Sequence, residues 1–323
     1  MIYDILIIGS GLAGLNSALK AANFGKVLVV TKSKLLDSNS NYAQGGIAAV
    51  VDAEDSFKKH IRDTIVAGAH HNNSKAVRYF VRHAPAAIAS LQKLGVKFAL
   101  NFNREAGHTE NRIVHVADHS GQSIMATMVK KVRANKNITI WENAFAIDLI
   151  VDEKKCFGAE IFYRRTAYSI FASRTILATG GAGQLYECTT NPTVTTGDGI
   201  ALAARAGCRM KDLEFLQFHP TATPKRTAGA HNLRSTQYPH PPLFLISETL
   251  RGEGAKLLNT KGQRFMLRYH KSAELAPRDI VSRAIYEEQK KPSRTPNSNK
   301  VLDRKSTRLN SSHSDRSRMP SSA

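Results

Sequence analysis

Apolar runs and helical spacing alternate along the N-terminal part of the chain. Residues 3–9, YDILIIG, form an apolar run rich in β-branched residues, which is typical of a strand buried in a parallel sheet. Residues 12–25 carry helical spacing, and Gly25 is a candidate C-cap glycine at their end. Residues 26–32, KVLVVTK, are again apolar. This order of strand, helix and strand predicts the first unit of a parallel α/β fold.

The middle of the chain changes from a helical to a strand pattern. Residues 57–94 carry helical spacing in two stretches, and Gly95 is a stop signal at their end. Residues 138–177 instead hold short apolar, β-branched segments that predict a run of strands. Residues 195–207, TTGDGIALAARAG, form a glycine turn that opens another helix. The whole pattern predicts an α/β fold.

The composition is that of a globular protein. Its 323 residues are enough for two domains with a sizeable core. The longest apolar runs fall far short of the roughly 20 residues that a membrane span needs, and the first residues lack the basic region of a signal peptide. Cys156, Cys188 and Cys208 have neither metal-ligand spacing nor an even number for disulfides. We therefore expect a cytoplasmic protein with no membrane partner and no metal site.

The formal net charge of +20 raises the question of a nucleic-acid partner. Basic residues are spread along the chain and no nucleic-acid motif appears, so we expect no such partner. Part of the charge comes from residues 304–323, which hold five Lys or Arg against one Asp, or +4. This segment is rich in Ser and Arg and has no periodicity, so we interpret it as a non-native, disordered tail. A native disordered tail is the alternative.

A dinucleotide-binding motif joins the first predicted strand to the first helix, with glycines at G-x-G-x-x-G spacing. The first glycine makes the turn, the second lets the backbone approach a pyrophosphate, and the third packs helix against strand. The N-terminus of the helix then faces the phosphates. A glycine turn without a ligand is the alternative, which the strand–turn–helix–strand context disfavours. The candidate cofactor-binding residues here are Gly9, Ser10, Gly11, Leu12, Ala13 and Gly14.

The second predicted strand departs from the usual pattern. A carboxylate commonly follows this strand and binds the ribose, whereas this chain has Thr31 and Lys32 there. Lys32 suits a phosphate better than a hydroxyl, so it is a candidate cofactor contact of a different kind.

Glycines recur at other junctions of the predicted elements. Residues 38–50, SNSNYAQGGIAAV, place small and amide residues before a Gly-Gly pair, which is typical of backbone lying against a flat ligand. In the turn at 195–207, Asp198 either caps the helix or contacts the ligand. Three such turns suit FAD, and without a second motif for a nicotinamide the substrate itself should reduce the flavin. The further candidates are Asn39, Ser40, Asn41, Tyr42, Ala43, Gln44, Gly45, Gly46, Gly180, Gly181 and Asp198.

Three long segments in the second half carry a family resemblance. DLEFLQFHPTA (212–222), SETLRGEGAKLLNTKGQRFM (247–266) and ELAPRDIVSRAI (274–285) occur in this order. Together with AQGGIAAV and TGDG, they resemble the succinate dehydrogenase and fumarate reductase flavoprotein superfamily, and within it the L-aspartate oxidase family. The resemblance covers residues 1–303.

The resemblance implies a fold of two domains. A Rossmann-like FAD-binding domain, with a parallel sheet and a β-meander, is expected over residues 1–215, and an α+β capping domain over 216–303. The family pattern continues with another His, another Arg, a last FAD-binding strand and a helical domain, so we expect a C-terminally truncated chain with both domains incomplete.

Three features favour the oxidase branch of the superfamily. Asn39 occupies the place where the dehydrogenases have the His that carries covalent FAD, which implies non-covalent FAD here. The sequence LAPRD (275–279) replaces their LASRD. The stretch REAGHTENRIVHV (104–116) is similar to the oxidase loop and unlike the dehydrogenase segment.

The resemblance also implies residue roles. A carboxylate at Glu105 would hydrogen-bond the ammonium of aspartate and repel succinate. His219 and Arg278 match the family's substrate-carboxylate ligand and its proton-transfer Arg. Because Arg is a poor base, it would need a relay through neighbours such as Glu248, Arg251 or Glu253. The other residues of the loop, His108, Arg112 and His115, either meet substrate or make local hydrogen bonds. The candidates are catalytic Arg278, Glu105 and His219, and substrate-binding His219, Ser247, Glu248 and Arg278.

The implied reaction is FAD-dependent oxidation of L-aspartate to iminoaspartate, with O₂ or fumarate as acceptor, as the first step of NAD biosynthesis. Quinolinate synthase would then be the partner that receives iminoaspartate. Two alternatives stay open: an inactive flavin-binding fragment, and a flavoprotein subunit of the succinate dehydrogenase or fumarate reductase type.

Overall fold

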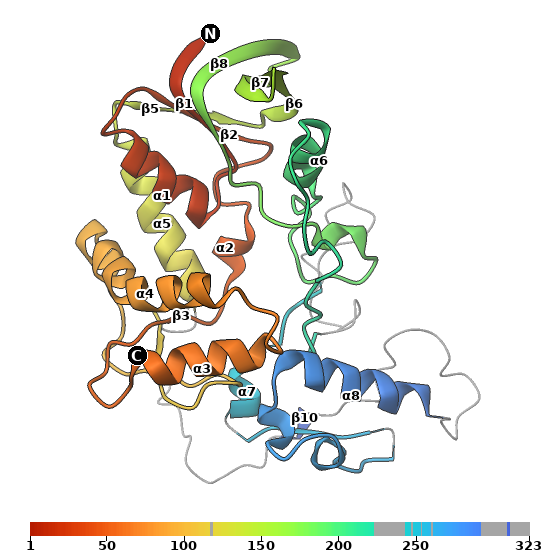
Figure 1. Ribbon diagram of the computed structural model, residues 1–323. Helices are drawn as coiled ribbons and strands as arrows, with labels where there is room; N and C mark the ends of the chain where they lie inside the picture. The colour runs from red at the N-terminus through yellow and green to blue at the C-terminus, as the bar shows by residue number, and fades with distance from the viewer. Residues whose placement is uncertain are drawn as a thin grey trace, which may run out of the picture.

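A six-stranded sheet forms the upper part of the molecule in Figure 1. The computed structural model describes residues 1–116, 119–222, 243–246, 248–252, 254–259, 261–291 and a short strand at 309–310. The strand order is β5-β2-β1-β8-β7-β6; the first four strands are parallel and the last three form an antiparallel meander. The strands are β1 (Ile2–Ile8), β2 (Val27–Thr31), β5 (Ile138–Glu142), β6 (Phe145–Asp152), β7 (Lys155–Tyr163) and β8 (Thr166–Leu177). The predicted parallel sheet and β-meander are confirmed.

Both faces of the central strands are covered, which explains why their sequences are apolar without alternation. On one face, Ile7, Val27 and Val29 pack against α1 and α5. On the other face, Leu6 and Leu28 pack beneath the meander and α6. The helices of this part are α1 (Leu12–Ala21), α5 (Ser120–Arg133) and α6 (Asp198–Arg205).

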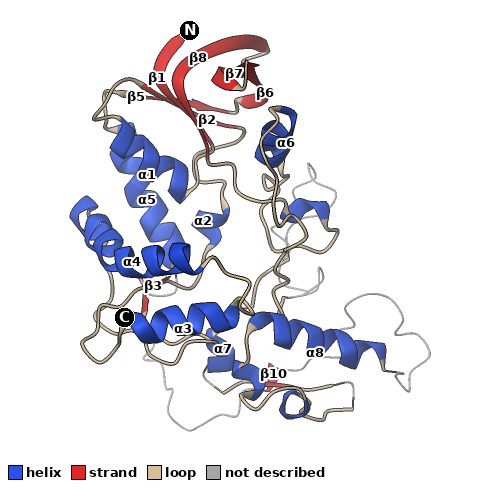
Figure 2. Cartoon of the chain, in the orientation of Figure 1, coloured by secondary structure: helices blue, strands red, loops and turns tan. Residues whose placement is uncertain are grey.

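A second layer of helices lies below α1 and α5 in Figure 2. Helix α4 crosses under them, and α3 runs beneath α4 toward the C-terminal part of the chain. Gly95 ends α4 with φ of +111°, as predicted, because glycine tolerates this left-handed geometry. The elements are α2 (Asn39–Tyr42), β3 (Ile47–Ala48), α3 (Phe57–Ala67), α4 (Ser74–Leu94) and β4 (Ile113–Val114).

The C-terminal part has its own small core, in which Leu257, Phe265 and Val281 are fully buried. Its elements are α7 (Thr249–Gly252), β9 (Lys256–Leu257), α8 (Arg278–Lys290), β10 (Leu309–Asn310) and 3₁₀ turns at Met266–Arg268 and Ala273–Leu275; a further turn, Gly183–Leu185, follows β8. Strand β10 pairs with β9. The other residues of the predicted tail at 304–323 lie outside the described residues.

Three expectations about the elements need correction. Helix α1 ends at Ala21 with Ala22 as its C-cap, so Gly25 is not the cap. Gly25 instead permits a close approach, because a Cβ there would lie 2.3 Å from the Asp4 carboxylate. The stretch 104–116 is not all loop, because β4 lies within it and pairs with β3.

Asp198 does not cap α6. The N-cap residue is Gly197, with φ of +81°, and the side chain of Asp198 turns to Lys32 instead. None of the helices in the described part of the chain combines the length and the apolar character that crossing a bilayer requires.

Candidate active site

The glycine turn between β1 and α1 brings helix and strand into direct backbone contact. Gly9 has φ of +113°, and a Cβ there would lie 2.2 Å from the carbonyl oxygen of Ala178. A Cβ on Gly14 would lie 2.0 Å from the carbonyl oxygen of Gly9. Gly11 differs, since nothing lies nearer to its Cβ position than the Ser40 hydroxyl at 3.4 Å. Two glycines are therefore needed for packing, and the middle one leaves the turn open to a ligand.

Serine hydroxyls line the same turn. The hydroxyl of Ser10 is buried and lies 3.0 Å from that of Thr31 at the end of β2. Ser40 accepts a hydrogen bond from the backbone amide of Leu12 at 3.1 Å, one of the free amides of the α1 N-terminus. Ser10 thus joins the ends of two strands, and Ser40 extends the polar turn toward α2.

Lys32 and Asp198 face each other across the carboxyl ends of the strands. The Lys32 ammonium lies 2.5 Å from an Asp198 carboxylate oxygen and also contacts Thr196. Burial alone would raise the pKa of Asp198, but the hydrogen bond from Lys32 lowers it below its usual value. Beside this pair, Asn39 donates a hydrogen bond of 2.8 Å to the hydroxyl of Thr195. The pair joins two turns that the sequence places far apart.

The backbone after β8 is open. Gly180 has φ of +71°, and neither it nor Gly181 has any atom within 4 Å of its Cβ position. Together with Gly11, these glycines leave space beside the backbone at the carboxyl ends of parallel strands, where doubly wound folds bind dinucleotides. The residues of this edge therefore fit FAD.

A cleft of about 1450 Å³ opens next to the QGG turn. Residues from four parts of the chain line it: the QGG turn, helix α3, the stretch 102–115 with His119, and the C-terminal part that includes Pro277. Polar side chains in its lining are Gln44, Arg62, Asp63, Arg104, Glu105, His108, His115, His119 and Lys271, among others. The cleft thus lies where a substrate would reach between the dinucleotide edge and the C-terminal part.

Glu105 lies at the junction of these parts. A Cβ on Gly45 would lie 2.5 Å from its carboxylate, and the Arg278 guanidinium is 3.9 Å away. Burial raises the pKa of Glu105, Arg278 opposes this rise, and the charge of Glu248 adds to it. An anion that is partly desolvated in this way favours a cationic ligand group.

Arg278 begins α8 and links two carboxylates. Its Nε donates to Glu248 at 2.7 Å, and its Nη1 donates to Gln217 at 3.3 Å. The second oxygen of Glu248 lies 3.2 Å from the guanidinium of Arg251. Burial lowers the pKa of Arg251, and the charge of Arg278 lowers it further against the opposing effect of Glu248. The structure thus joins Arg278, Glu248 and Arg251 in one chain of contacts.

His219 is half-buried near this chain. Its Nδ1 lies 2.8 Å from the carbonyl oxygen of Thr221. Burial lowers the pKa of His219, and the charge of Arg278 lowers it further. Ser247 and Glu253, two other predicted participants, lie outside the described residues.

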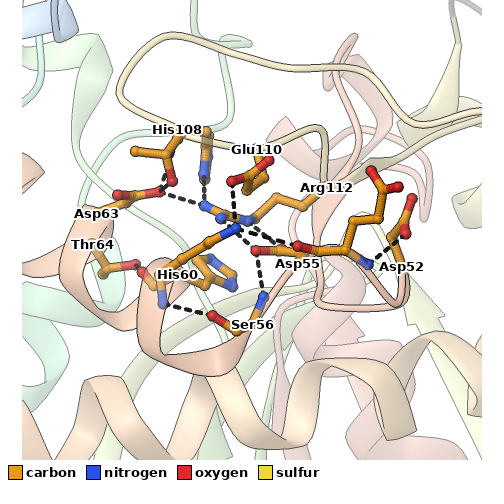
Figure 3. A network of polar contacts seen from close by, with 12 residues as sticks. Asp52, Asp55, Ser56, His60, Asp63, Thr64, His108, Glu110 and Arg112 are labelled. Carbon is orange, nitrogen blue, oxygen red and sulfur yellow. Dashed lines mark hydrogen bonds and ion pairs between the residues drawn. The ribbon is translucent and has the colours of Figure 1, made fainter.

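Arg112 is the most deeply buried charged side chain of the site region, with no exposed surface. Its guanidinium grips both oxygens of Asp55, at 2.7 and 2.8 Å, and donates to Asp63 at 2.7 Å (Figure 3). The same Nη1 lies 3.0 Å from Nδ1 of His108. Asp63 also accepts hydrogen bonds from the amide and hydroxyl of Thr109. Of the two roles predicted for Arg112, contact with substrate or local hydrogen bonds, the structure shows the local hydrogen bonds.

Sequence reasoning missed Asp55 and Asp63. They precede and lie within α3, about fifty residues from Arg112, and no motif marks them. Their signal was weak: two carboxylates at the start and middle of a predicted amphipathic helix, where one buried acid implies a buried cation.

Comparisons with known proteins agree with this geometry. A family model described as FAD binding domain matches residues 4–317. The chain is 46% identical to an L-aspartate oxidase of Ralstonia nicotianae, covering 90% of this chain and 55% of that relative. It is 44% identical to an L-aspartate oxidase of Synechocystis, covering 88% of this chain and 50% of that relative. The chain spans about half the length of the curated relatives it matches.

Solved structures show the same fold. An E. coli quinol fumarate reductase has a TM-score of 0.84 and 29% identity, covering 95% of this chain and 53% of that chain. Mycobacterium smegmatis Sdh1 has a TM-score of 0.72 and 32% identity, covering 92% of this chain and 51% of that one. With its glycine turns in place and a family model that matches nearly its whole length, the chain belongs to the FAD binding domain family.

Proposed function

We propose that this chain forms the FAD site and substrate cleft of an enzyme that oxidises L-aspartate to iminoaspartate, with O₂ or fumarate as the final acceptor. The observation that carries the proposal is the place of Glu105, whose carboxylate lies in the cleft between Gly45 of the QGG turn and Arg278. L-aspartate loses two electrons and two protons in this reaction. When bound, FAD supplies the acceptor for the electrons. The similarity to L-aspartate oxidases supports the proposal.

Glu105 would select the substrate by its charge. Its carboxylate would accept a charge-assisted hydrogen bond from the ammonium of aspartate. Succinate has no ammonium, so it would bring only negative charge to a partly buried anion. A polar site of this kind can reject the analogue that lacks the polar group by roughly 10⁴-fold.

Arg278 and His219 would hold the other end of the ligand. Arg278 keeps donors at its Nη atoms, and a guanidinium matches the planar geometry of a carboxylate. Because Arg278 is a poor base, a proton that leaves the substrate would pass on to the carboxylate of Glu248, which lies 2.7 Å from Nε of Arg278. The guanidinium of Arg251, 3.2 Å from the other oxygen of Glu248, would stabilise that carboxylate before it accepts the proton. These residues would also stabilise charge that develops on the substrate.

The remaining assignments follow the same proposal. FAD would be held non-covalently by the three glycine turns, because the Asn39 amide hydrogen-bonds Thr195 and is no nucleophile. Acid precipitation should therefore release all flavin from the protein. A cytoplasmic location, the extent of the two domains, and delivery of iminoaspartate to quinolinate synthase stay predictions.

The test is anaerobic reduction of the FAD-loaded chain by two dicarboxylates. L-aspartate should bleach the visible absorbance of the flavin, and succinate at the same concentration should not. Glu105→Gln should weaken the response to aspartate about 10- to 100-fold, the value of one hydrogen bond to a charged group. Glu110→Gln is the matched control, since Glu110 lies in the same loop but pairs with Lys59 outside the cleft.

Two results would contradict the proposal. Equal bleaching by aspartate and succinate would favour a flavoprotein of the succinate dehydrogenase type. A chain that takes up no FAD would be the inactive fragment, whatever its cleft resembles.

A further inference from the structure

The contact between Arg112 and His108 fixes which nitrogen of His108 carries the proton. A guanidinium has donors and no acceptor, and Nη1 of Arg112 lies 3.0 Å from Nδ1 of His108. Nδ1 must therefore be the acceptor, which leaves the proton of the neutral ring on Nε2. Burial lowers the pKa of His108, and the charge of Arg112 lowers it further, so the neutral ring is favoured.

Arg112 cannot turn away from this contact. Two of its donors are fixed on both oxygens of Asp55, and Nη1 is shared between Asp63 and His108. Asp63 is itself fixed by two hydrogen bonds from Thr109, the residue after His108. Figure 3 shows the ring of His108 standing over this network. The loop and the ring are thus held by the same buried ions.

His108 and His115 both line the cleft that contains Glu105. Nε2 of His108 lies on the ring edge away from Arg112, and within the described part of the chain nothing hydrogen-bonds it. His115 is 9% exposed, and neither of its ring nitrogens has a partner among the described residues. A buried imidazole without a partner is costly unless a ligand satisfies it.

We propose that Arg112 is a positioning residue that holds His108 as its Nε2–H tautomer, and that His108 and His115 form a donor subsite for one carboxylate of a dicarboxylate ligand. The subsite rests on the proposed function for its ligand class. It adds two imidazole donors to a cleft whose central group, Glu105, is an anion. The neutral ring of His108 would hold a ligand carboxylate without neutralising Glu105, whose charge would remain for the ammonium.

The first measurement reads the tautomer directly. The chain is labelled with ¹⁵N-histidine, and two-bond ¹H–¹⁵N correlations distinguish Nε2–H from Nδ1–H. His108, assigned by the loss of its signals in His108→Gln, should show the Nε2–H pattern. His83 is the internal reference for the opposite tautomer, since its Nδ1 lies 2.7 Å from the carbonyl oxygen of Tyr79, which can only accept. An Nδ1–H or imidazolium pattern for His108 at pH 7 would overturn the assignment.

The second measurement is calorimetric titration of the purified chain with L-aspartate. The amide of Gln reaches the position of Nε2, whereas the shorter amide of Asn does not. His108→Gln should therefore keep the affinity within about threefold, while His108→Asn and His115→Phe should each lose about tenfold. His83→Gln, an exposed control, should change nothing.

The two proposals fail differently. Unchanged affinity in both His108→Asn and His115→Phe would remove the subsite, even if aspartate reduced the flavin. Failure of aspartate to bleach the flavin, with the tautomer and the affinity losses as stated, would remove the oxidase function and leave the subsite standing. His108→Gln and His108→Asn both remove the imidazole that contacts Arg112, so a loss of affinity in His108→Asn alone is not a consequence of that lost contact.

Discussion

Replacing Arg112 by Met tests whether the buried ion network holds the loop. Arg112 has no exposed surface, and its removal leaves the carboxylates of Asp55 and Asp63 buried without their cation. Breaking a buried ion pair by removing one partner costs about 3 to 5 kcal/mol. Here two carboxylates lose their partner, so the free energy of unfolding should fall by at least the lower value.

The matched control is Arg283→Met. Arg283 pairs with Asp279 on the exposed face of α8, and an exposed pair contributes less than about 1 kcal/mol. Urea unfolding can be followed by the fluorescence of Trp141, the one tryptophan of the chain, which stacks on Tyr163 at 4.6 Å in the sheet. If Arg112→Met and Arg283→Met shift the unfolding free energy equally, the network does not stabilise the loop.

The pH dependence separates this explanation from lost packing. Burial alone would raise the pKa of Asp55 and Asp63, but hydrogen bonds from Arg112 hold both below 3.8. A lowered folded pKa gives stability that is present above pH 3.8 and lost as the pH falls through the folded value. In Arg112→Met the largest opposing effect is lost, and mainly the hydrogen bonds from Ser56 and Thr109 still counter the rise in pKa that burial causes. Protonation therefore relieves the variant, and its deficit in unfolding free energy should shrink toward pH 4. A deficit that is independent of pH would show that packing alone was lost.

Two further predictions concern titration and glycine. Burial, with the charge of Arg112, lowers the pKa of His60 to about 4 from 6.5. As the pH falls, the unfolded chain therefore binds the proton before the folded chain does, and the free energy of unfolding should fall by up to about 3 kcal/mol between pH 6.5 and 4. His60→Phe should flatten this part of the plot of urea midpoint against pH. Gly14→Ala should destabilise the fold, because its Cβ would lie 2.0 Å from the carbonyl oxygen of Gly9. The Cβ of Gly181→Val would meet no atom within 4 Å, so this variant should keep the melting temperature while lowering FAD affinity at least about tenfold.

The sheet and the dinucleotide edge could be predicted because their signals are local. An apolar strand, a glycine turn and a helix follow one another within β1 and α1, and the role of Gly14 depends on the carbonyl of Gly9 in the same unit. The contact of Gly9 with Ala178, which follows β8, is the part that is not local. The end of α1 could not be predicted from Gly25, because that glycine serves a contact with Asp4 across the turn. A glycine in the sequence indicates an unusual backbone conformation or a close contact, but it does not identify the neighbouring residue that requires it.

Pairs between distant segments were out of reach for a different reason. Lys32 has its counter-charge in Asp198, and the separation along the chain is 166 residues. Each residue alone invites a local explanation: a phosphate contact for Lys32 and a helix cap for Asp198. Only the meeting of β2 and α6 at one edge of the sheet shows that their charges compensate each other.

Strand β4 within the stretch 104–116 explains which of the neighbouring side chains face the cleft and which face the interior. Successive side chains of a strand point to opposite sides. Ile113 and His115 both line the cleft, whereas Arg112 turns to the buried acids and Val114 packs in a core with Ala49 and Ile88. The apolar residues Ile113 and Val114 alone do not predict which side of this short strand faces the cleft, since both sides are buried. The burial of Arg112 settles which side is which: its guanidinium faces Asp55 and Asp63, and the alternation of the strand then places His115 on the side of the cleft.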